Sequence, residues 1–325
     1  MAITLKELQA PVKAELAVFE QRFAMSMKTR VPLLNTIMNY IIRRKGKQIR
    51  PLFVMYSARL CGKISERTYR AASLVELLHT ATLVHDDVVD ESYERRGFFS
   101  INALWKNKIA VLVGDYLLSR GLLLSVEHDD FDLLKITSRA VRDMSEGELM
   151  QLERSRFLDI TEDIYFEIIR QKTASLIASC CAIGAASAGA DAGQIEQFRF
   201  FGERIGLAFQ IRDDLFDFGD NDSGKPTGID IREKKLTLPL IYALKQVSSG
   251  EAKSILRLIK SDKPDAEKLK LVTAFVSAHG GMDYARETMN RLREEAFEAI
   301  RGHLEKQNAE VDMRKLVDFV IDRKH

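Results

Sequence analysis

The sequence predicts an all-α protein built as a large bundle of antiparallel helices. Only 6 prolines and 18 glycines punctuate its 325 residues, of which 46% are hydrophobic. Sparse helix breakers favour long helices, and a chain of this length can bury a substantial core. Strand signals are nearly absent, because apolar runs such as residues 109–113 continue into helical pattern without turn residues. We expect one domain spanning residues 1–325.

The expected helices follow in order along the chain. Residues 5–56 show helical spacing with a break at 44–51, and residues 69–90 form a long helix with a wide apolar stripe. Residues 91–100 are polar and predict a loop. Further helices are expected at 103–126, 131–154, 160–188 and 198–218. A long loop at 219–234 precedes a helix near Thr237 and Pro239, and residues from 251 onward are amphipathic and helical.

Charge and cysteine usage limit the possible partners and setting. The net charge of +2 gives no general reason to expect nucleic-acid binding. Cys61, Cys180 and Cys181 lack metal-ligand spacing, so buried thiols in a reducing cytoplasmic setting are favoured. The first residues lack a signal pattern, and we expect no segment to approach the roughly 18 apolar residues of a membrane span.

Two segments with the pattern Asp-Asp-x-x-Asp end apolar helices. They contain Asp86, Asp87 and Asp90, and Asp213, Asp214 and Asp217. In each, the first and third aspartates share a helix face and the second is rotated by about 100°. Like charges one turn apart cost roughly 0.2 to 0.5 kcal/mol per pair. One motif alone would be a solvated helix end, but two, each followed by a basic loop, indicate sites for Mg²⁺.

Basic residues near both motifs indicate what the metals would hold. They are Lys45, Lys47 and Arg50 around Gly46, Arg95 and Arg96 after the first motif, and Lys225 and Lys235 after the second. Arginine offers a planar fork of hydrogen-bond donors and lysine a compact positive charge, and both bind phosphate well. We therefore expect a polyphosphate ligand. The common glycine-rich nucleotide loops are absent from the sequence, which argues against a nucleotide cradle.

Taken together, the chain resembles the trans-isoprenyl diphosphate synthases, most of all the long-chain heptaprenyl and octaprenyl enzymes. The motifs that carry the resemblance are Gly46-Lys47-Gln48-Ile49-Arg50-Pro51, Glu76-Leu77-Leu78-His79, the two aspartate motifs, Arg95-Arg96-Gly97, Gly114-Asp115-Tyr116, Lys172-Thr173, Phe209-Gln210, Gly224-Lys225 and Lys235-Leu236-Thr237-Leu238-Pro239. One departure is Lys234, where members often carry glycine.

The resemblance implies a helical fold around a central active-site cavity, a homodimer, and three Mg²⁺ ions with substrate bound. It implies that the isopentenyl diphosphate is held by Lys47, Arg50, His79 and Arg96. It implies that the allylic diphosphate is surrounded by Arg95, Lys172, Thr173, Gln210, Lys225 and Lys235, with Lys172, Thr173 and Gln210 closest to the chemistry. The metal ligands would be Asp86, Asp90 and Asp213, assisted by Asp87, Asp214 and Asp217.

Product length should depend on the helix that leads into Asp86. In the resembling family, bulky aromatics four and five residues before the first aspartate stop short products, whereas Thr82 and Ala81 stand here. Small side chains leave a tunnel open and favour a heptaprenyl to octaprenyl product or longer, as used for quinone side chains. Alternatively, Ala81 and Thr82 are small for helix packing alone, and the product is geranylgeranyl or farnesyl diphosphate.

Other functions compete with this one. A class I terpene cyclase also ionises an allylic diphosphate, but lacks a second diphosphate site such as Lys47, Arg50 and Arg96 would form. A noncatalytic synthase subunit would not need both aspartate motifs. An EF-hand is disfavoured because Ile231 stands where the closing glutamate is required.

Overall fold

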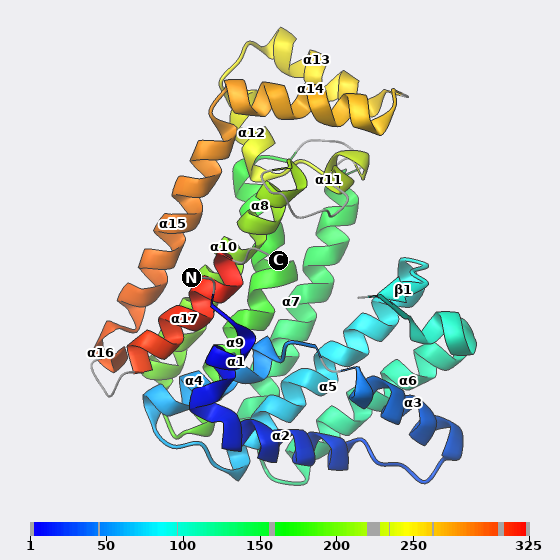
Figure 1. Cartoon of the computed structure of the whole chain (residues 1–325), viewed down its shortest axis with the longest axis vertical. Coiled ribbons are helices and arrows are strands. Elements are labelled where there is room, and N and C mark those ends of the chain that lie inside the picture. The colour runs from blue at the N-terminus through cyan, green and yellow to red at the C-terminus, as the bar shows by residue number, and fades with distance from the viewer. Residues whose placement is uncertain are drawn as a thin grey trace.

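Helices make up nearly all of the structure, a computed structural model that describes residues 3–44, 46–95, 97–155, 160–219, 228–233, 235–261, 263–304 and 309–322. Long helices pack side by side along the molecule, and α13 and α14 lie across one end (Figure 1). The predicted all-α class is confirmed. The strand pair in the described ranges is a short antiparallel ribbon, β1 (Glu94–Arg95) with β2 (Phe98–Phe99), inside the predicted loop at 91–100.

The amino-terminal half contains the helix that carries the first aspartate motif and the helical elements around it. They are α1 (Leu5–Gln9), a 3-10 turn (Ala10–Val12), α2 (Lys13–Ser26), α3 (Pro32–Arg43), α4 (Ile49–Cys61), α5 (Glu66–Val89), α6 (Ile101–Val126) and α7 (Phe131–Ser155). A capping box between Ser65 and Thr68 starts α5, and no glycine or proline interrupts it before the aspartates. Its buried faces pack on α4, α6, α7 and α9.

The carboxyl-terminal half contains α8 (Glu162–Ile169), a π-helical turn (Arg170–Ala174), α9 (Ser175–Ser187), α10 (Ala192–Asp217), α11 (Ile229–Arg232), α12 (Leu238–Lys245), α13 (Ser249–Lys260), α14 (Asp265–Ala278), α15 (Gly281–Ala299), α16 (Arg301–Leu304) and α17 (Ala309–Ile321). The predicted helix over 160–188 is therefore confirmed as one helical stretch, but its middle is a π turn and not an α-helix. A π turn inside a helix is rare and frequently marks a functional site.

Two glycines explain how the π turn fits between its neighbours. A Cβ at Gly147 of α7 would lie 2.6 Å from the backbone nitrogen of Lys172, and one at Gly206 of α10 would lie 2.5 Å from the Cα of Ala174. Real Cβ atoms do not approach so closely, so only glycine permits this packing. The backbone of the turn is consequently held from both sides.

Helix α6 matches the predicted helix at 103–126, although Lys106 departs from helical geometry, and it is more apolar than expected. Its best 18-residue window has a mean hydropathy of 1.7, enough by length and composition to cross a membrane, and 33% of that window is buried. The expectation that no segment approaches a membrane span is therefore wrong for α6. The exposed apolar side chains along this helix are Leu104, Val111, Leu112, Leu122, Leu123 and Val126.

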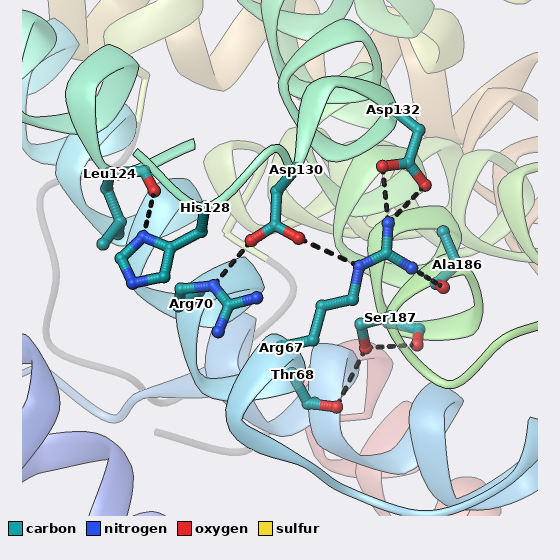
Figure 2. Close-up of polar contacts among 10 residues, drawn as sticks. Arg67, Thr68, Arg70, Leu124, His128, Asp130, Asp132, Ala186 and Ser187 are labelled. Carbon is teal, nitrogen blue, oxygen red and sulfur yellow. Dashed lines mark hydrogen bonds and ion pairs between the residues drawn. The ribbon is translucent and has the colours of Figure 1, made fainter. Parts of the chain in front are cut away.

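A charged cluster joins three helices at the amino end of α5 (Figure 2). The Arg67 guanidinium donates to Asp130 at 3.0 Å and to the carbonyl of Ala186 at 2.9 Å, and its other nitrogen contacts Asp132 at 2.5 Å. Arg70 donates to the second oxygen of Asp130 at 2.6 Å. The start of α5, the α6–α7 turn and the end of α9 are thereby tied together.

Candidate functional site

The aspartates of both motifs lie on the faces that helical periodicity predicts. Asp86 and Asp90 are exposed and Asp213 is half-buried, whereas Asp87 and Asp214 are each 4% exposed. The second aspartate of each motif therefore points into the protein. This placement favours Asp86, Asp90 and Asp213 as ligands for a cation and disfavours Asp87 and Asp214.

Asp217 has a different role from its counterpart Asp90. Its two carboxylate oxygens accept the backbone N–H groups of Ile229 and Asp230, both at 2.9 Å, at the start of α11. It thus fixes the chain where it returns after residues 220–227. The same pattern of aspartates therefore leaves two outward carboxylates in the first motif and only Asp213 in the second.

Asp213 is itself oriented by a buried cation. Arg212, 7% exposed, donates to Asp213 at 2.6 Å. Its guanidinium lies 5.0 Å from the ring centroid of Phe209 and 4.7 Å from that of Phe216. Stacked aromatic rings and a carboxylate on one guanidinium restrict its movement, so the position of Asp213 is well defined.

A polar cavity lies where α8, the π turn and α10 meet. It is a hollow with about 550 Å³ of empty space, which includes open solvent at its mouth. Its polar lining is Gln151, Tyr165, Lys172, Thr173, Gln210, Asp214, Asp230, Lys235 and Thr237. The structure therefore brings together the predicted residues Lys172, Thr173, Gln210 and Lys235, although they are far apart in the sequence.

Hydrogen bonds order one wall of this polar cavity. Thr173 donates its hydroxyl to the Gln210 side-chain oxygen at 2.8 Å, and the Gln210 amide donates to Asp214 at 2.9 Å. The buried hydroxyl of Tyr165 donates to the other Asp214 oxygen at 2.6 Å. Burial, assisted by the charge of Asp230, raises the pKa of Asp214 to about 8. Asp214 therefore acts as an anchor for Gln210.

Three polar residues of this cavity, Tyr165, Gln151 and Asp230, are not among those that the sequence predicts. Asp230 is half-buried, and burial together with the charge of Asp217 raises its pKa to about 6. None of the three belongs to a recognisable charged motif, and each joins the site only because helices far apart in the chain converge. Asp230 alone had a signal, since it lies in the acidic loop that follows the second motif.

The cations of the polar cavity are each held by a carboxylate. Lys172 forms an ion pair with Glu148 at 2.5 Å and donates to Gln151 at 3.2 Å, both on α7. Lys235 pairs with Glu233. Burial lowers the pKa of Lys235, but the carboxylates of Glu233 and Asp230 outweigh it and raise that pKa overall. The ammonium group of Lys235 is therefore charged at neutral pH, and both lysines offer donors suited to an anion.

A second, narrower hollow runs beside α5. It has about 240 Å³ of empty space, which includes open solvent, and is lined mostly by apolar side chains from α5, α7 and α9. The residues are Val75, Leu78, His79, Thr82, Thr137, Ala140, Val141, Met144, Leu176 and Ser179. Thr82 is one of these lining residues. Ala81 instead belongs to a buried cluster with Ala110 and Val113 of α6, so the two proposed gate residues face different sides.

The predicted isopentenyl diphosphate residues are only partly described. Arg50 forms an ion pair with Glu76 at 2.7 Å, and Lys47 lies 5.8 Å from the ring centroid of Phe319. His79 lines the narrow hollow. Lys45, Arg96, Lys225 and Lys234 lie outside the described residues, as does the side chain of Arg95.

An aromatic and cationic bracket holds the ribbon that follows the first motif. The Arg44 guanidinium lies 3.4 Å from the Tyr40 ring centroid and 4.3 Å from that of Phe98. The carbonyl of Phe99 accepts from the Tyr40 hydroxyl at 2.5 Å and from Arg44 at 3.3 Å. Arg44 directly precedes the Lys45–Pro51 segment. These contacts thus hold the ribbon against the end of α3.

The donor set fits Mg²⁺ with a phosphate ligand. Within the described ranges, no group of three or more histidine, cysteine or acidic side chains converges as a ready-made metal cage. Magnesium does not need one, because it is usually held by one or two carboxylates plus waters and phosphates. Asp86 with Asp90 in the first motif, and Asp213 in the second, offer carboxylates of that kind.

Comparison with known proteins places this geometry in a family. Residues 31–276 match the family described as Polyprenyl synthetase. Over 304 residues the chain is 38% identical to an all-trans-nonaprenyl-diphosphate synthase (geranyl-diphosphate specific) of Rhodobacter capsulatus, covering 92% of this chain and 93% of that protein.

Solved structures show the same fold. A decaprenyl diphosphate synthase from Rhodobacter capsulatus superposes with a TM-score of 0.88 at 33% identity, covering 99% of this chain and 100% of that one. A polyprenyl synthase from Caulobacter crescentus CB15, complexed with calcium and isoprenyl diphosphate, gives 0.85 at 33% identity, covering 100% and 99%.

Proposed function

The chain belongs to the polyprenyl synthetase family of prenyltransferases, and we propose that it condenses isopentenyl diphosphate head to tail with an allylic diphosphate to make a long-chain all-trans polyprenyl diphosphate. The observation that carries this proposal is the pairing of two cavities. A polar cavity with Lys172, Thr173, Gln210 and Lys235 suits a diphosphate, and an apolar hollow beside α5 suits a growing hydrocarbon. A quinone side chain is the proposed use of the product.

Bound Mg²⁺, proposed as three ions with substrate present, would neutralise charge on the departing diphosphate. The related Caulobacter crescentus structure, which holds calcium with isoprenyl diphosphate, supports a divalent cation here. Asp86, Asp90 and Asp213 would hold the ions. Lys172 and Lys235 would contact the allylic diphosphate once their carboxylate partners release them, and Lys225 and Arg95 are proposed to join them.

The reaction begins when the allylic carbon–oxygen bond breaks and its electron pair leaves with the diphosphate. The oxygen atoms of Thr173 and Gln210, fixed by their mutual hydrogen bond and by Asp214, present dipoles toward the allylic cation. The isopentenyl double bond then forms the new carbon–carbon bond, and a proton lost to the diphosphate restores neutrality. Lys47, Arg50, His79 and Arg96 would orient the isopentenyl diphosphate for this step.

The proposed product is of heptaprenyl to octaprenyl length or longer. Thr82 leaves the narrow hollow open at the level where bulky residues stop short products, and the hollow continues two turns of α5 further, to Val75. Geranylgeranyl or farnesyl diphosphate remains the alternative product. Chain-length analysis after incubation with isopentenyl diphosphate, an allylic primer and Mg²⁺ decides between them.

The same incubation tests the catalytic assignment. Asp213→Asn should lower the rate of isopentenyl incorporation strongly, whereas Asp163→Asn on the first turn of α8 should not. Cyclic hydrocarbons formed from the allylic diphosphate alone would instead indicate a terpene cyclase. No Mg²⁺-dependent polyprenyl product with any primer would contradict the proposal.

We further propose a cytoplasmic homodimer whose subunits each consist of a single domain. The exposed stripe on α6, with Leu112, Leu122 and Leu123 each more than 40% exposed, supports a helix that is covered by a second subunit. Sedimentation of the purified protein should give twice the mass of 36.9 kDa, and Leu112→Glu should shift it toward one chain. A sedimenting monomer in the unmodified protein would contradict the dimer.

A further inference from the structure

Helical spacing puts the charged cluster of Figure 2 on the helix faces that line the narrow hollow, about three turns away along each helix. Eleven residues make close to three helical turns, so residues eleven apart share a face. On α5, Arg67 and Thr68 lie eleven residues before the lining residues Leu78 and His79. Thr68 accepts a hydrogen bond from Ser187 at 3.0 Å.

The same spacing holds on the other two helices of the hollow. Asp130, just before α7, lies eleven residues before Val141, and Ser187 at the end of α9 lies eleven residues after Leu176. All three lining helices therefore converge on one polar cluster, three turns from the hollow. In Figure 1 this is the end of α5 that lies away from β1.

Along each of the three helices, buried apolar residues lie between the residues of the cluster and those of the hollow. Ala71 and Ile183 are 0% exposed and Leu133 is 1% exposed. A growing hydrocarbon can push such side chains aside, since one apolar contact replaces another. It cannot do the same to Asp130, because separating this carboxylate from Arg67 and Arg70 would leave a buried charge without its partners.

We propose that the Arg67–Asp130–Arg70 cluster is the end stop of the product tunnel and sets the maximum chain length. This inference rests on the proposed long-chain product. The cluster acts at a distance from the chemistry, so Arg67 and Asp130 are length-limiting residues. Their ionic contacts hold α5, α7 and α9 together at the point where further growth would have to part them.

Helix geometry gives the expected length. Thr82 and Arg67 are fifteen residues apart, about 22 Å along α5. An isoprene unit adds four chain bonds, roughly 4.8 Å when extended at the bond spacing of an extended backbone. A growing hydrocarbon that extends past Thr82 therefore gains between four and five isoprene units before it reaches Arg67. Added to the three or four units of a farnesyl or geranylgeranyl chain, this predicts about seven to nine units.

The test compares product lengths of the full-length enzyme and three variants, with farnesyl diphosphate, isopentenyl diphosphate and Mg²⁺. Asp130→Asn removes the buried charge. The double variant Arg67→Met with Asp130→Leu replaces the Arg67–Asp130 pair by apolar groups of similar size, a change that buried pairs often tolerate. It leaves Arg70, whose side chain is 23% exposed, without Asp130. Asp132→Asn is the matched control, because Asp132 binds the same Arg67 but its side chain is 54% exposed.

We expect the main product of Asp130→Asn and of the double variant to lengthen by at least one isoprene unit, with the control unchanged. The rate of the first condensation should stay the same, because Arg67 lies about 28 Å from Asp86 along α5. An unchanged product length in a folded variant overturns the end stop while leaving the long-chain function intact. If the unmodified enzyme makes a product of four isoprene units or fewer, both the end stop and the long-chain function are overturned.

Discussion

A bulky side chain at either of two positions in the narrow hollow beside α5 should limit the length of the product. Thr82 and Val75 both line it and are seven residues, or two helical turns, apart. This corresponds to about 10.5 Å along the helix and about two isoprene units. We therefore expect Thr82→Phe to give a main product about two units shorter than Val75→Phe gives, and both to fall below the product of the unmodified enzyme.

Ala81→Phe provides a contrast on the same helix. Ala81 is fully buried in the cluster with Ala110 and Val113, on the side of α5 that packs on α6. A phenylalanine there overpacks the core, at a typical cost of about 1 to 3 kcal/mol. It should lower the midpoint of chemical unfolding more than Thr82→Phe does, and shorten the product less.

The assay is incubation of each purified variant with isopentenyl diphosphate, an allylic primer and Mg²⁺, followed by mass analysis of the dephosphorylated products. Unfolding midpoints are measured on the same preparations. If Ala81→Phe shortens the product as much as Thr82→Phe, the hollow is not the path of the chain. Products of equal length from Thr82→Phe and Val75→Phe would refute the idea that distance along α5 sets product length.

Three further predictions concern the parts that hold the site in place. Arg44→Met should raise the KM for isopentenyl diphosphate several-fold without changing the KM for the allylic diphosphate. Arg43→Met, at an exposed position, is the control. Equal changes in both constants would contradict a role of Arg44 in the isopentenyl diphosphate site. Gly206→Ala should lower kcat at least tenfold by displacing the π turn, whereas Gly193→Ala, at the exposed start of α10, should not. Asp130→Asn should destabilise the protein at neutral pH. Burial raises the pKa of Asp130, but hydrogen bonds and charge from two arginines outweigh it and lower that pKa below 3.8. Its stabilisation is therefore present above that value and lost as pH falls through the folded pKa, so unfolding midpoints of the two proteins should converge in acid.

Helical periodicity predicted the orientation of the aspartates because it depends only on the local backbone. Asp87 and Asp214 are turned inward as expected. It could not predict the π turn at Arg170–Ala174, which depends on the close approach of Gly147 and Gly206 from two other helices. Thr82 and Ala81 could not be told apart either, since both are small and only the packing of α6 decides which one faces the hollow.

The two aspartate motifs show why one pattern need not give one site. Asp90 caps the carboxyl end of α5 at an exposed position. Asp217 occupies the equivalent place on α10, but there the chain returns, and the two N–H groups that start α11 need an acceptor. Backbone N–H groups and a cation compete for the same oxygens. The first motif is therefore better able to hold a cation between two carboxylates, and the second contributes mainly Asp213.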